Sequence, residues 1–218
     1  RRGELPLKNM ALVHLERIDE EIAAAKRLTA ELVADLPPAS SIRLSVNLSS
    51  MMLTGQLDQV FGERMIFVCF SKREFKYYLD AAIRYLAARA GGLELELFFV
   101  SNEKELVVPA QQLSRSSARE YLEYLAKAFH AGHKDIWPFS PDFNFDWLQV
   151  QDWPNEELYN KIKKEFTRFK YPLEEPHLLS AFRNRFFENA EVLEAFKDNA
   201  QVITAIVREI FPTLNFEN

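Results

Sequence analysis

The sequence has a single cysteine, Cys69, among its 218 residues. One cysteine excludes an internal disulfide framework and fits a reducing compartment, so we expect a cytoplasmic protein. No apolar run approaches the roughly 20 residues of a membrane-spanning helix, and no signal peptide is visible. A membrane is therefore not an expected partner.

Glycine is also scarce, with six residues in the chain. We find no Gly-rich phosphate loop, nucleophile elbow, zinc-ligand spacing or internal repeat. The composition is otherwise that of an ordinary soluble globular protein, with 48% hydrophobic and 27% charged residues. The chain opens with Arg1-Arg2-Gly3 rather than methionine, which indicates a fragment of a longer polypeptide or a processed product.

A basic excess is missing as well. Lysine and arginine total 27 against 32 acidic residues, and the formal net charge is −5. Residues 1–100 carry 13 charges of each sign, so the whole deficit lies in the second half. Independent DNA-binding domains usually show a basic excess, because phosphate contacts dominate their affinity. If this chain contacts nucleic acid, we expect it to do so locally, within a larger basic assembly.

The stretch from Gly55 to Ala90 is the centre of the predicted fold. Two short strands are expected around a turn at Gly62-Glu63, and residues 66–70 are all apolar, which is typical of a strand covered on both faces. The tetrapeptide 71–74, Ser-Lys-Arg-Glu, fits a capping box, so a helix is predicted to begin at Lys72. Apolar residues recur in that helix at three- and four-residue steps, and this face should lie on the sheet.

Further elements surround this centre. Residues 10–35 predict an amphipathic helix whose apolar stripe, which includes Ile18, packs on the sheet, and residues 41–48 alternate as a half-buried strand does. Gly91-Gly92 should end the central helix before a strand that begins at Leu93 and turns at 101–104 into a last strand. Pro109 places that last strand at an edge. The expected fold is α/β, with a mixed central sheet of about five strands flanked by helices.

The second half of the chain is expected to be a helical extension. A second capping box at residues 117–120 predicts a helix with an apolar stripe that includes Phe129 and ends at Gly132. Residues 136–147 are rich in aromatics, which either stack on bases or, as we favour, pin this connection to the core. Asn155 is expected to cap a helix that runs to about Lys170, and two further helices are expected around 182–187 and over 192–210. We expect residues 1–132 to form the core and residues 133–218 to pack on it as one structural unit.

The hexapeptide 55–60, Gly-Gln-Leu-Asp-Gln-Val, resembles a strand of the RecB-type nucleases, members of the PD-(D/E)XK superfamily. In those enzymes the aspartate binds a catalytic metal, and the next strand carries an acid-x-Lys triplet. That triplet is missing here, because the chain has Cys69-Phe70-Ser71, or Phe70-Ser71-Lys72 one residue later. The order of the predicted elements also resembles the restriction-endonuclease-like core of the superfamily.

The missing triplet bears on the chemistry that the resemblance implies. Mg²⁺ is held by hard oxygen ligands, and two-metal cleavage of a phosphodiester needs several carboxylates. His14 stands where RecB-type nucleases have a metal-ligating histidine, but a lone histidine near an apolar stripe is more often structural. We therefore expect a degenerate site at His14, Asp58, Cys69 and Ser71, with no catalytic residue, bound metal or cofactor.

Four stretches together resemble the family of RecC C-terminal domains, from the exodeoxyribonuclease V gamma chain, over nearly the whole chain. They are the opening Gly3-Glu4-Leu5-Pro6, residues 53–58, the helix start at 71–76, and Tyr121 to Pro141 with its Trp-Pro-Phe-Ser-Pro segment. The resemblance implies a non-catalytic scaffold that assembles with RecB-like and RecD-like subunits at double-strand breaks, contacts RecD, and helps to split or guide DNA.

Three functions remain open. The first is this scaffold, with Lys72, Arg73 and Lys76 as candidate DNA contacts, since cations beside the exposed amides of a helix start attract phosphate. The second is a Mg²⁺-dependent nuclease that uses His14, Asp58 and a further acid, either Glu20 or Glu94. The third is a protein-interaction module that touches no DNA.

Overall fold

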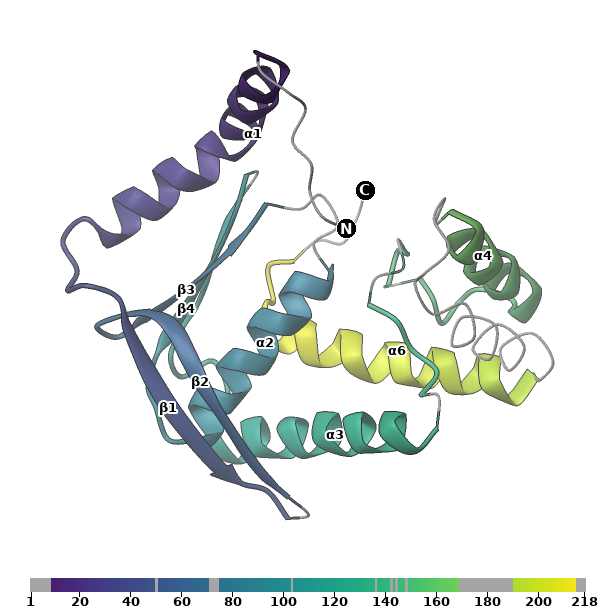
Figure 1. Ribbon diagram of the computed structural model, residues 1–218. Coiled ribbons are helices and arrows are strands. Elements are labelled where there is room, and N and C mark those ends of the chain that lie inside the picture. The colour runs from purple at the N-terminus through teal and green to yellow at the C-terminus, as the bar shows by residue number, and fades with distance from the viewer. Residues whose placement is uncertain are drawn as a thin grey trace.

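One five-stranded sheet organises the chain (Figure 1). The computed structural model describes residues 9–49, 51–70, 75–102, 104–135, 137–141, 143, 145–147, 149–168 and 190–214. In chain order its elements are α1 (Asn9–Val33), β1 (Ser40–Asn47), β2 (Met52–Phe61), β3 (Arg64–Cys69), α2 (Phe75–Ala90), β4 (Glu96–Ser101), β5 (Glu105–Val108), α3 (Arg115–Lys134), α4 (Asn155–Arg168) and α6 (Ala190–Ile210). The predicted helix start at residues 71–74 and the helix around 182–187 lie outside the described residues.

The sheet is mixed, and its strands follow the chain in the order β1-β2-β3-β4-β5. All neighbouring pairs are antiparallel except β3 and β4, which run parallel, with α2 as the crossover that a parallel pair requires. The apolar strand β3 lies at the centre and β5 lies at an edge before Pro109, as predicted. The prediction of an α/β fold with a mixed sheet of about five strands is confirmed.

Helices cover both faces of the sheet (Figure 1). One face packs on α2, α3 and α6, and these elements share one hydrophobic cluster with the aromatic segment before α4. The other face packs on α1, where Ala25 and Leu28 meet Ile66, Phe98 and Val100. Since apolar burial stabilises by about 25 cal/mol per Å², the two clusters are the main source of stability.

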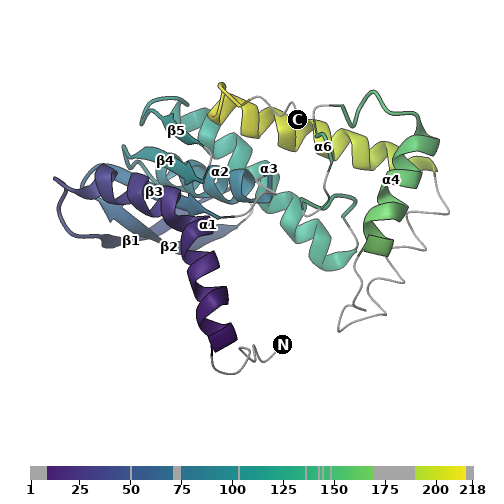
Figure 2. The same cartoon turned by 90° about the horizontal axis from the view of Figure 1, so that it is seen from above.

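Only the C-terminal half of α1 lies on the sheet. Figure 2 shows the N-terminal half extending away from it, and Ile18 is 49% exposed. The helix itself was predicted correctly, but the expectation that its whole stripe packs on the sheet is wrong at Ile18. The reason is geometric, because a helix of 25 residues spans roughly 38 Å at 1.5 Å per residue and outruns the strands beneath it. None of the described helices is long and apolar enough to span a membrane.

The ends of two helices test the sequence signals for capping. The amide of Leu93 donates to the Ala88 carbonyl and that of Gly92 to Arg89, with Gly92 at φ +87°, so α2 ends in the predicted glycine cap. In contrast, α3 starts earlier than predicted. Its N-cap is Ser114, whose hydroxyl accepts from the amide of Ser117 at 3.0 Å. The predicted capping box at 117–120 is therefore wrong, since these residues already belong to the helix.

The start of α4 also differs from the prediction. The Leu158 amide donates to the Pro154 carbonyl at 3.0 Å, so Asn155 is the first helical residue rather than the cap. The strand expected from Leu93 begins at Glu96. Leu93 still belongs to the C-terminal cap of α2, since its amide donates to the Ala88 carbonyl, and the strand starts three residues later. Such shifts of a few residues leave the topology unchanged.

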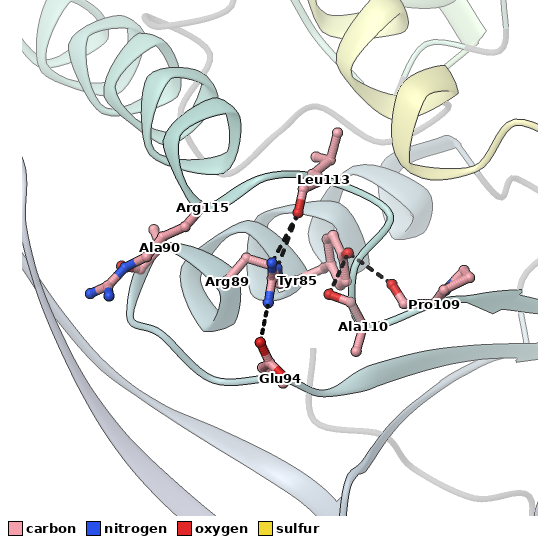
Figure 3. A network of polar contacts seen from close by, with 8 residues as sticks. All are labelled: Tyr85, Arg89, Ala90, Glu94, Pro109, Ala110, Leu113 and Arg115. Carbon is pink, nitrogen blue, oxygen red and sulfur yellow. Dashed lines mark hydrogen bonds and ion pairs between the residues drawn. The ribbon is translucent and has the colours of Figure 1, made fainter.

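Buried polar groups fasten the connection between β5 and α3 to the end of α2 (Figure 3). Arg89 is 8% exposed, and its Nε and Nη2 donate to the Leu113 carbonyl at 3.2 and 3.1 Å, while Nη1 lies 3.7 Å from a carboxylate oxygen of Glu94. One turn earlier, the buried Tyr85 hydroxyl donates to the carbonyls of Pro109 and Ala110 at 2.9 and 3.2 Å. The connection is held through its backbone, so it positions α3 against the core.

Candidate functional site

The candidate site begins at Asp58, which lies in a β-bulge of β2. Ser40 pairs with Val60 and Ile42 with Leu57, so residues 58 and 59 together oppose Ser41. Gln59 adopts φ +59°, a left-handed conformation that is uncommon for a residue other than glycine. Bulges of this kind redirect side chains and are frequent beside functional sites.

The Asp58 carboxylate is exposed and is held by two neutral side chains. One oxygen accepts from the Ser41 hydroxyl at 2.5 Å and from the Gln56 amide at 2.8 Å. These bonds, the one from Gln56 before the one from Ser41, hold the pKa of Asp58 below its usual value, with a smaller contribution from the positive charge of Arg84. The bulge therefore presents an ionised, hydrogen-bonded carboxylate.

In the described part of the chain, the strand next to Asp58 provides no matching ligand. β2 and β3 pair only at Val60–Met65 and Phe61–Arg64 in the described ladder, close to the turn that joins them. Cys69, at the far end of β3, is 1% exposed and belongs to the core. Ser71 lies outside the described residues, so its predicted place in the site stays a prediction.

A cation faces the sheet from α2. The Arg84 guanidinium carbon lies 5.2 Å from the centre of the Phe67 ring on β3, and Arg84 Nε lies 3.0 Å from an oxygen of Asp80. Arg84 also lowers the pKa of Asp58, as described above. The nearest described partner of the Arg84 charge is therefore Asp80, and its effect on Asp58 is the weakest of the influences on the pKa of that carboxylate.

The other acids and the histidine that the nuclease hypothesis needs are not assembled around Asp58 in the part of the chain that the structure describes. His14 belongs to α1, but its side chain lies outside the described residues. Glu20 is exposed on α1, and Glu94 lies against Arg89 at the C-terminal end of α2. Among the described residues there is no group of three or more His, Cys, Asp or Glu side chains able to hold a metal ion.

The candidate DNA contacts are only partly described. Lys72 and Arg73 lie outside the described residues, and Lys76 is in the first described turn of α2. The Lys76 ammonium lies 5.2 Å from the centre of the Tyr77 ring. Its charge is thus partly engaged with an aromatic face, at a cation–π distance.

The aromatic segment before α4 is part of the core, as we favoured. Trp147 stacks on Phe75 of α2 at 4.7 Å between ring centres, and Phe139 lies 5.1 Å from Trp147. Phe143 and Trp147 are buried, and both lie against Phe196 of α6. The buried rings of Phe143 and Trp147 are unavailable for stacking on bases, and they connect α2 to α6.

Sequence reasoning missed two groups of the described structure. The Asp80–Arg84 pair has the four-residue spacing of a helical ion pair, a signal that was present but was not used. Phe129 was assigned to the apolar stripe of α3. The polar residues around it were the available indication of a solvent-facing helix end, and they are Lys127, His130, His133 and Lys134.

Comparison with known proteins identifies a family. The family described as the RecC C-terminal domain matches residues 1–152, more than half of the chain. The match therefore includes the whole sheet, Asp58, α3 and the aromatic segment. No curated protein matches the chain.

Proposed function

The chain belongs to the family of RecC C-terminal domains, and from this premise we propose that it is a non-catalytic scaffold domain of a bacterial helicase–nuclease complex. Family membership supports a role in the RecBCD complex and in DNA repair and recombination. The finer proposal is that the domain helps to split or guide DNA and contacts the RecB-like and RecD-like subunits of the same complex.

The observation that carries the non-catalytic part is the environment of Asp58. The carboxylate accepts from two neutral donors, and the charge of Arg84 acts on it. Two-metal cleavage of a phosphodiester needs several converging carboxylates to hold cations. Within the described residues no such set surrounds Asp58, so the geometry favours a nuclease-like scaffold over a Mg²⁺-dependent nuclease.

The proposal is tested by cleavage of linear duplex and single-stranded DNA with Mg²⁺ or Mn²⁺, alongside isothermal titration of Mn²⁺ into the wild type and Asp58→Ala. We expect no cleavage and the same metal uptake by both proteins. Asp152→Ala, which removes an exposed acid before α4, is the matched control. Cleavage that disappears in Asp58→Ala but persists in Asp152→Ala would establish the nuclease instead.

The DNA contacts are proposed separately at Lys72, Arg73 and Lys76. Cations at the start of a helix add to the partial positive charge of its exposed amides and favour phosphate. Reversal of the three charges should weaken fork binding by the assembled complex and flatten its salt dependence. An unchanged salt dependence would exclude these residues as the contact.

We also propose that residues 1–132 and 133–218 act as one structural unit. The shared hydrophobic cluster supports it, because it joins Tyr85 of α2 and Phe99 of β4 to Trp147 and Phe196. Removal of residues 133–218 should therefore expose the face of α2 that packs on Trp147 and make the remainder aggregate. A well-folded, soluble fragment of residues 1–132 would contradict this proposal.

A further inference from the structure

The strand β1 forms one edge of the sheet, and Figure 1 shows it along the outer margin. Its pairing with β2 decides which main-chain groups point outward. The Leu48 amide donates to the Met51 carbonyl at 2.8 Å, so these residues face each other as a hydrogen-bonded pair. Such pairs alternate with non-bonded pairs along an antiparallel ladder. Residues 42, 44 and 46 therefore bond to β2, whereas the N–H and C=O groups of residues 43, 45 and 47 point away from it.

The outward main-chain groups of Arg43 and Ser45 are open. In the part of the chain that the structure describes, no group donates to or accepts from them. At Asn47 the outward carbonyl accepts a hydrogen bond from the Arg119 guanidinium of α3. This contact agrees with the direction assigned to residue 47 and marks the end of the open stretch. The edge thus presents two donors and two acceptors in the spacing of a strand.

The two edges of the sheet differ in how they are protected. The edge strand β5 has four residues, among them the exposed Glu105, and Pro109 follows it. Short length, charge and proline all discourage pairing with another chain. In contrast, β1 has eight residues, no proline and a single charge, and the extra residue of the bulge belongs to β2. An edge of this kind readily accepts a further strand.

The side chains of β1 indicate what that further strand must carry. Ile42 and Leu44 are half-buried on the face that packs on the helical core, and a neighbouring apolar strand would cover them further. Arg43 is exposed on the opposite face and forms no ion pair with any described residue. Opposite charges on facing residues of two strands stabilise the pair. The edge therefore favours a strand of alternating apolar and polar residues with an acid opposite Arg43.

A second copy of β1 fits this edge less well. Antiparallel self-pairing centred on Arg43 would place like charges directly opposite, which is destabilising. Self-pairing centred on Leu44 would leave Arg43 facing a serine, without a countercharge. Self-pairing centred on Ser45 would need the Asn47 carbonyl, which already accepts from Arg119. The charge of Arg43 thus selects a different chain as the occupant.

We propose that the outer edge of β1 binds an extended, acidic segment of a partner protein, which joins the sheet as an antiparallel strand. The main chain of the segment bonds to Arg43 and Ser45, its alternate apolar side chains lie beside Ile42 and Leu44, and its carboxylate pairs with the Arg43 guanidinium. Main-chain bonds supply affinity in this mode of recognition, and the alternate side chains supply specificity. The inference goes beyond the proposed function, since it assigns a binding mode and a peptide chemistry that require no DNA.

The test is fluorescence anisotropy of a labelled peptide, Thr-Val-Thr-Val-Glu-Val, titrated with the full 218-residue chain. In the antiparallel register its glutamate lies opposite Arg43 and its second threonine opposite Ser45. N-methylation of these two peptide residues removes the amides that donate to the edge, so binding should be lost. N-methylation of the first two valines is the matched control, because their amides point away from β1. That peptide should still bind.

Two variants of the chain test the same geometry. Ser45→Pro removes an outward N–H but no bond to β2, so the protein should fold and lose peptide binding. The wild type should bind the glutamate peptide roughly 2- to 5-fold more tightly than its lysine analogue, and Arg43→Glu should reverse this order. Lys163→Glu reverses an exposed charge on α4 and should keep the preference of the wild type.

Several results would overturn the site. The first is no saturable binding of the peptide to the wild type at about 1 mM. The second is an equal effect of the two methylation patterns, or a preference that Lys163→Glu reverses as Arg43→Glu does. Light scattering supplies the third, because a wild-type dimer that becomes monomeric in Ser45→Pro would assign the edge to a second copy. None of these outcomes depends on cleavage or on Mn²⁺ uptake, which test the proposed function.

Discussion

Glu123 of α3 accepts two hydrogen bonds from Ser49 at the tip of the β1–β2 hairpin, one from the amide at 3.0 Å and one from the hydroxyl at 2.8 Å. Beside this contact, the Arg119 guanidinium donates to the Asn47 carbonyl and lies 3.7 Å from Glu123. The hairpin extends from the sheet edge, and these contacts fasten its tip to a helix whose sequence lies more than 70 residues away.

Glu123→Ala should release the hairpin tip. The hydrogen bonds from Ser49, the hydroxyl before the amide, hold the pKa of Glu123 below its ordinary value of 4.5. A lowered pKa means that the stabilisation is present above pH 4.5 and is lost as the pH falls through the folded-state pKa. The protection factors of the amides at residues 47–49 should therefore fall in the variant, and in the wild type at acid pH, once the rates are corrected for the intrinsic pH dependence of exchange. Glu120→Ala is the control, and equal exchange in the two variants would refute the role of Glu123.

Tyr121 should ionise at a higher pH than an ordinary tyrosine. Its hydroxyl donates to a carboxylate oxygen of Glu209 on α6, and this hydrogen bond raises the pKa of Tyr121 from 10.0 to about 12. A raised pKa means that the contact stabilises the fold fully below pH 10 and is lost as the pH rises through about 12. Tyrosinate absorbance should show one tyrosine that titrates near pH 12 and is absent from Tyr121→Phe. A titration unchanged by that substitution would contradict the assignment.

Arg89→Ala should destabilise the protein by about 2–4 kcal/mol. The substitution removes two hydrogen bonds from a charged donor and leaves the Leu113 carbonyl without them. Arg84→Ala is the matched control, because that arginine forms a half-exposed ion pair, which is worth at most about 1 kcal/mol. Urea unfolding measures both free energies. Equal losses of unfolding free energy in the two variants would show that the buried hydrogen bonds of Arg89 contribute no more to stability than an exposed ion pair does.

Trp147→Phe should cost far less than Trp147→Ala. The indole Nε1 is buried without a hydrogen-bond partner among the described residues. The Trp147→Phe substitution therefore reduces the volume of the side chain but removes no hydrogen bond. Alanine leaves a cavity among Phe75, Phe139 and Phe196 and should cost about 3–5 kcal/mol. Thermal unfolding of the two variants gives the comparison. A loss in Trp147→Phe as large as that in Trp147→Ala would indicate that the indole nitrogen has a partner.

Gly92→Ala should destabilise the protein by about 1 kcal/mol or more. Gly92 has φ +87°, and an added Cβ would lie 3.3 Å from the Arg115 guanidinium. Gly55→Ala in β2 is the control, because a Cβ there meets no atom within 4 Å and the backbone is not left-handed. Chemical denaturation should leave the control within about 0.5 kcal/mol of the wild type. A destabilised Gly55→Ala would contradict the comparison.

Local patterns predicted the sheet well because its strands alternate between faces or are wholly apolar, and each signal lies within a few residues. The alternation of residues 41–48 predicted a half-buried strand, the apolar run at 66–70 a strand inside the sheet, and Pro109 an edge, and all three strands are present. The expected cover on both faces fails at Phe70, which follows the end of β3 and is 51% exposed. The capping box at 117–120 failed, because Ser114 offers an earlier cap with the same chemistry. Asp58 was recognised from a motif, but its hydrogen bonds depend on the bulge that places Ser41 opposite it.

The sequence by itself determined the succession of helices and strands, the loss of the acid-x-Lys triplet and the family resemblance, since all three depend on the order of residue types. Only the tertiary structure decided which members of an apolar stripe are covered. Ile18 and Phe129 carry the same pattern as their buried neighbours, yet both face solvent, because coverage depends on where other elements end. The same reason explains why Arg84 lies over the Phe67 ring, because that contact requires α2 to cross the sheet at β3.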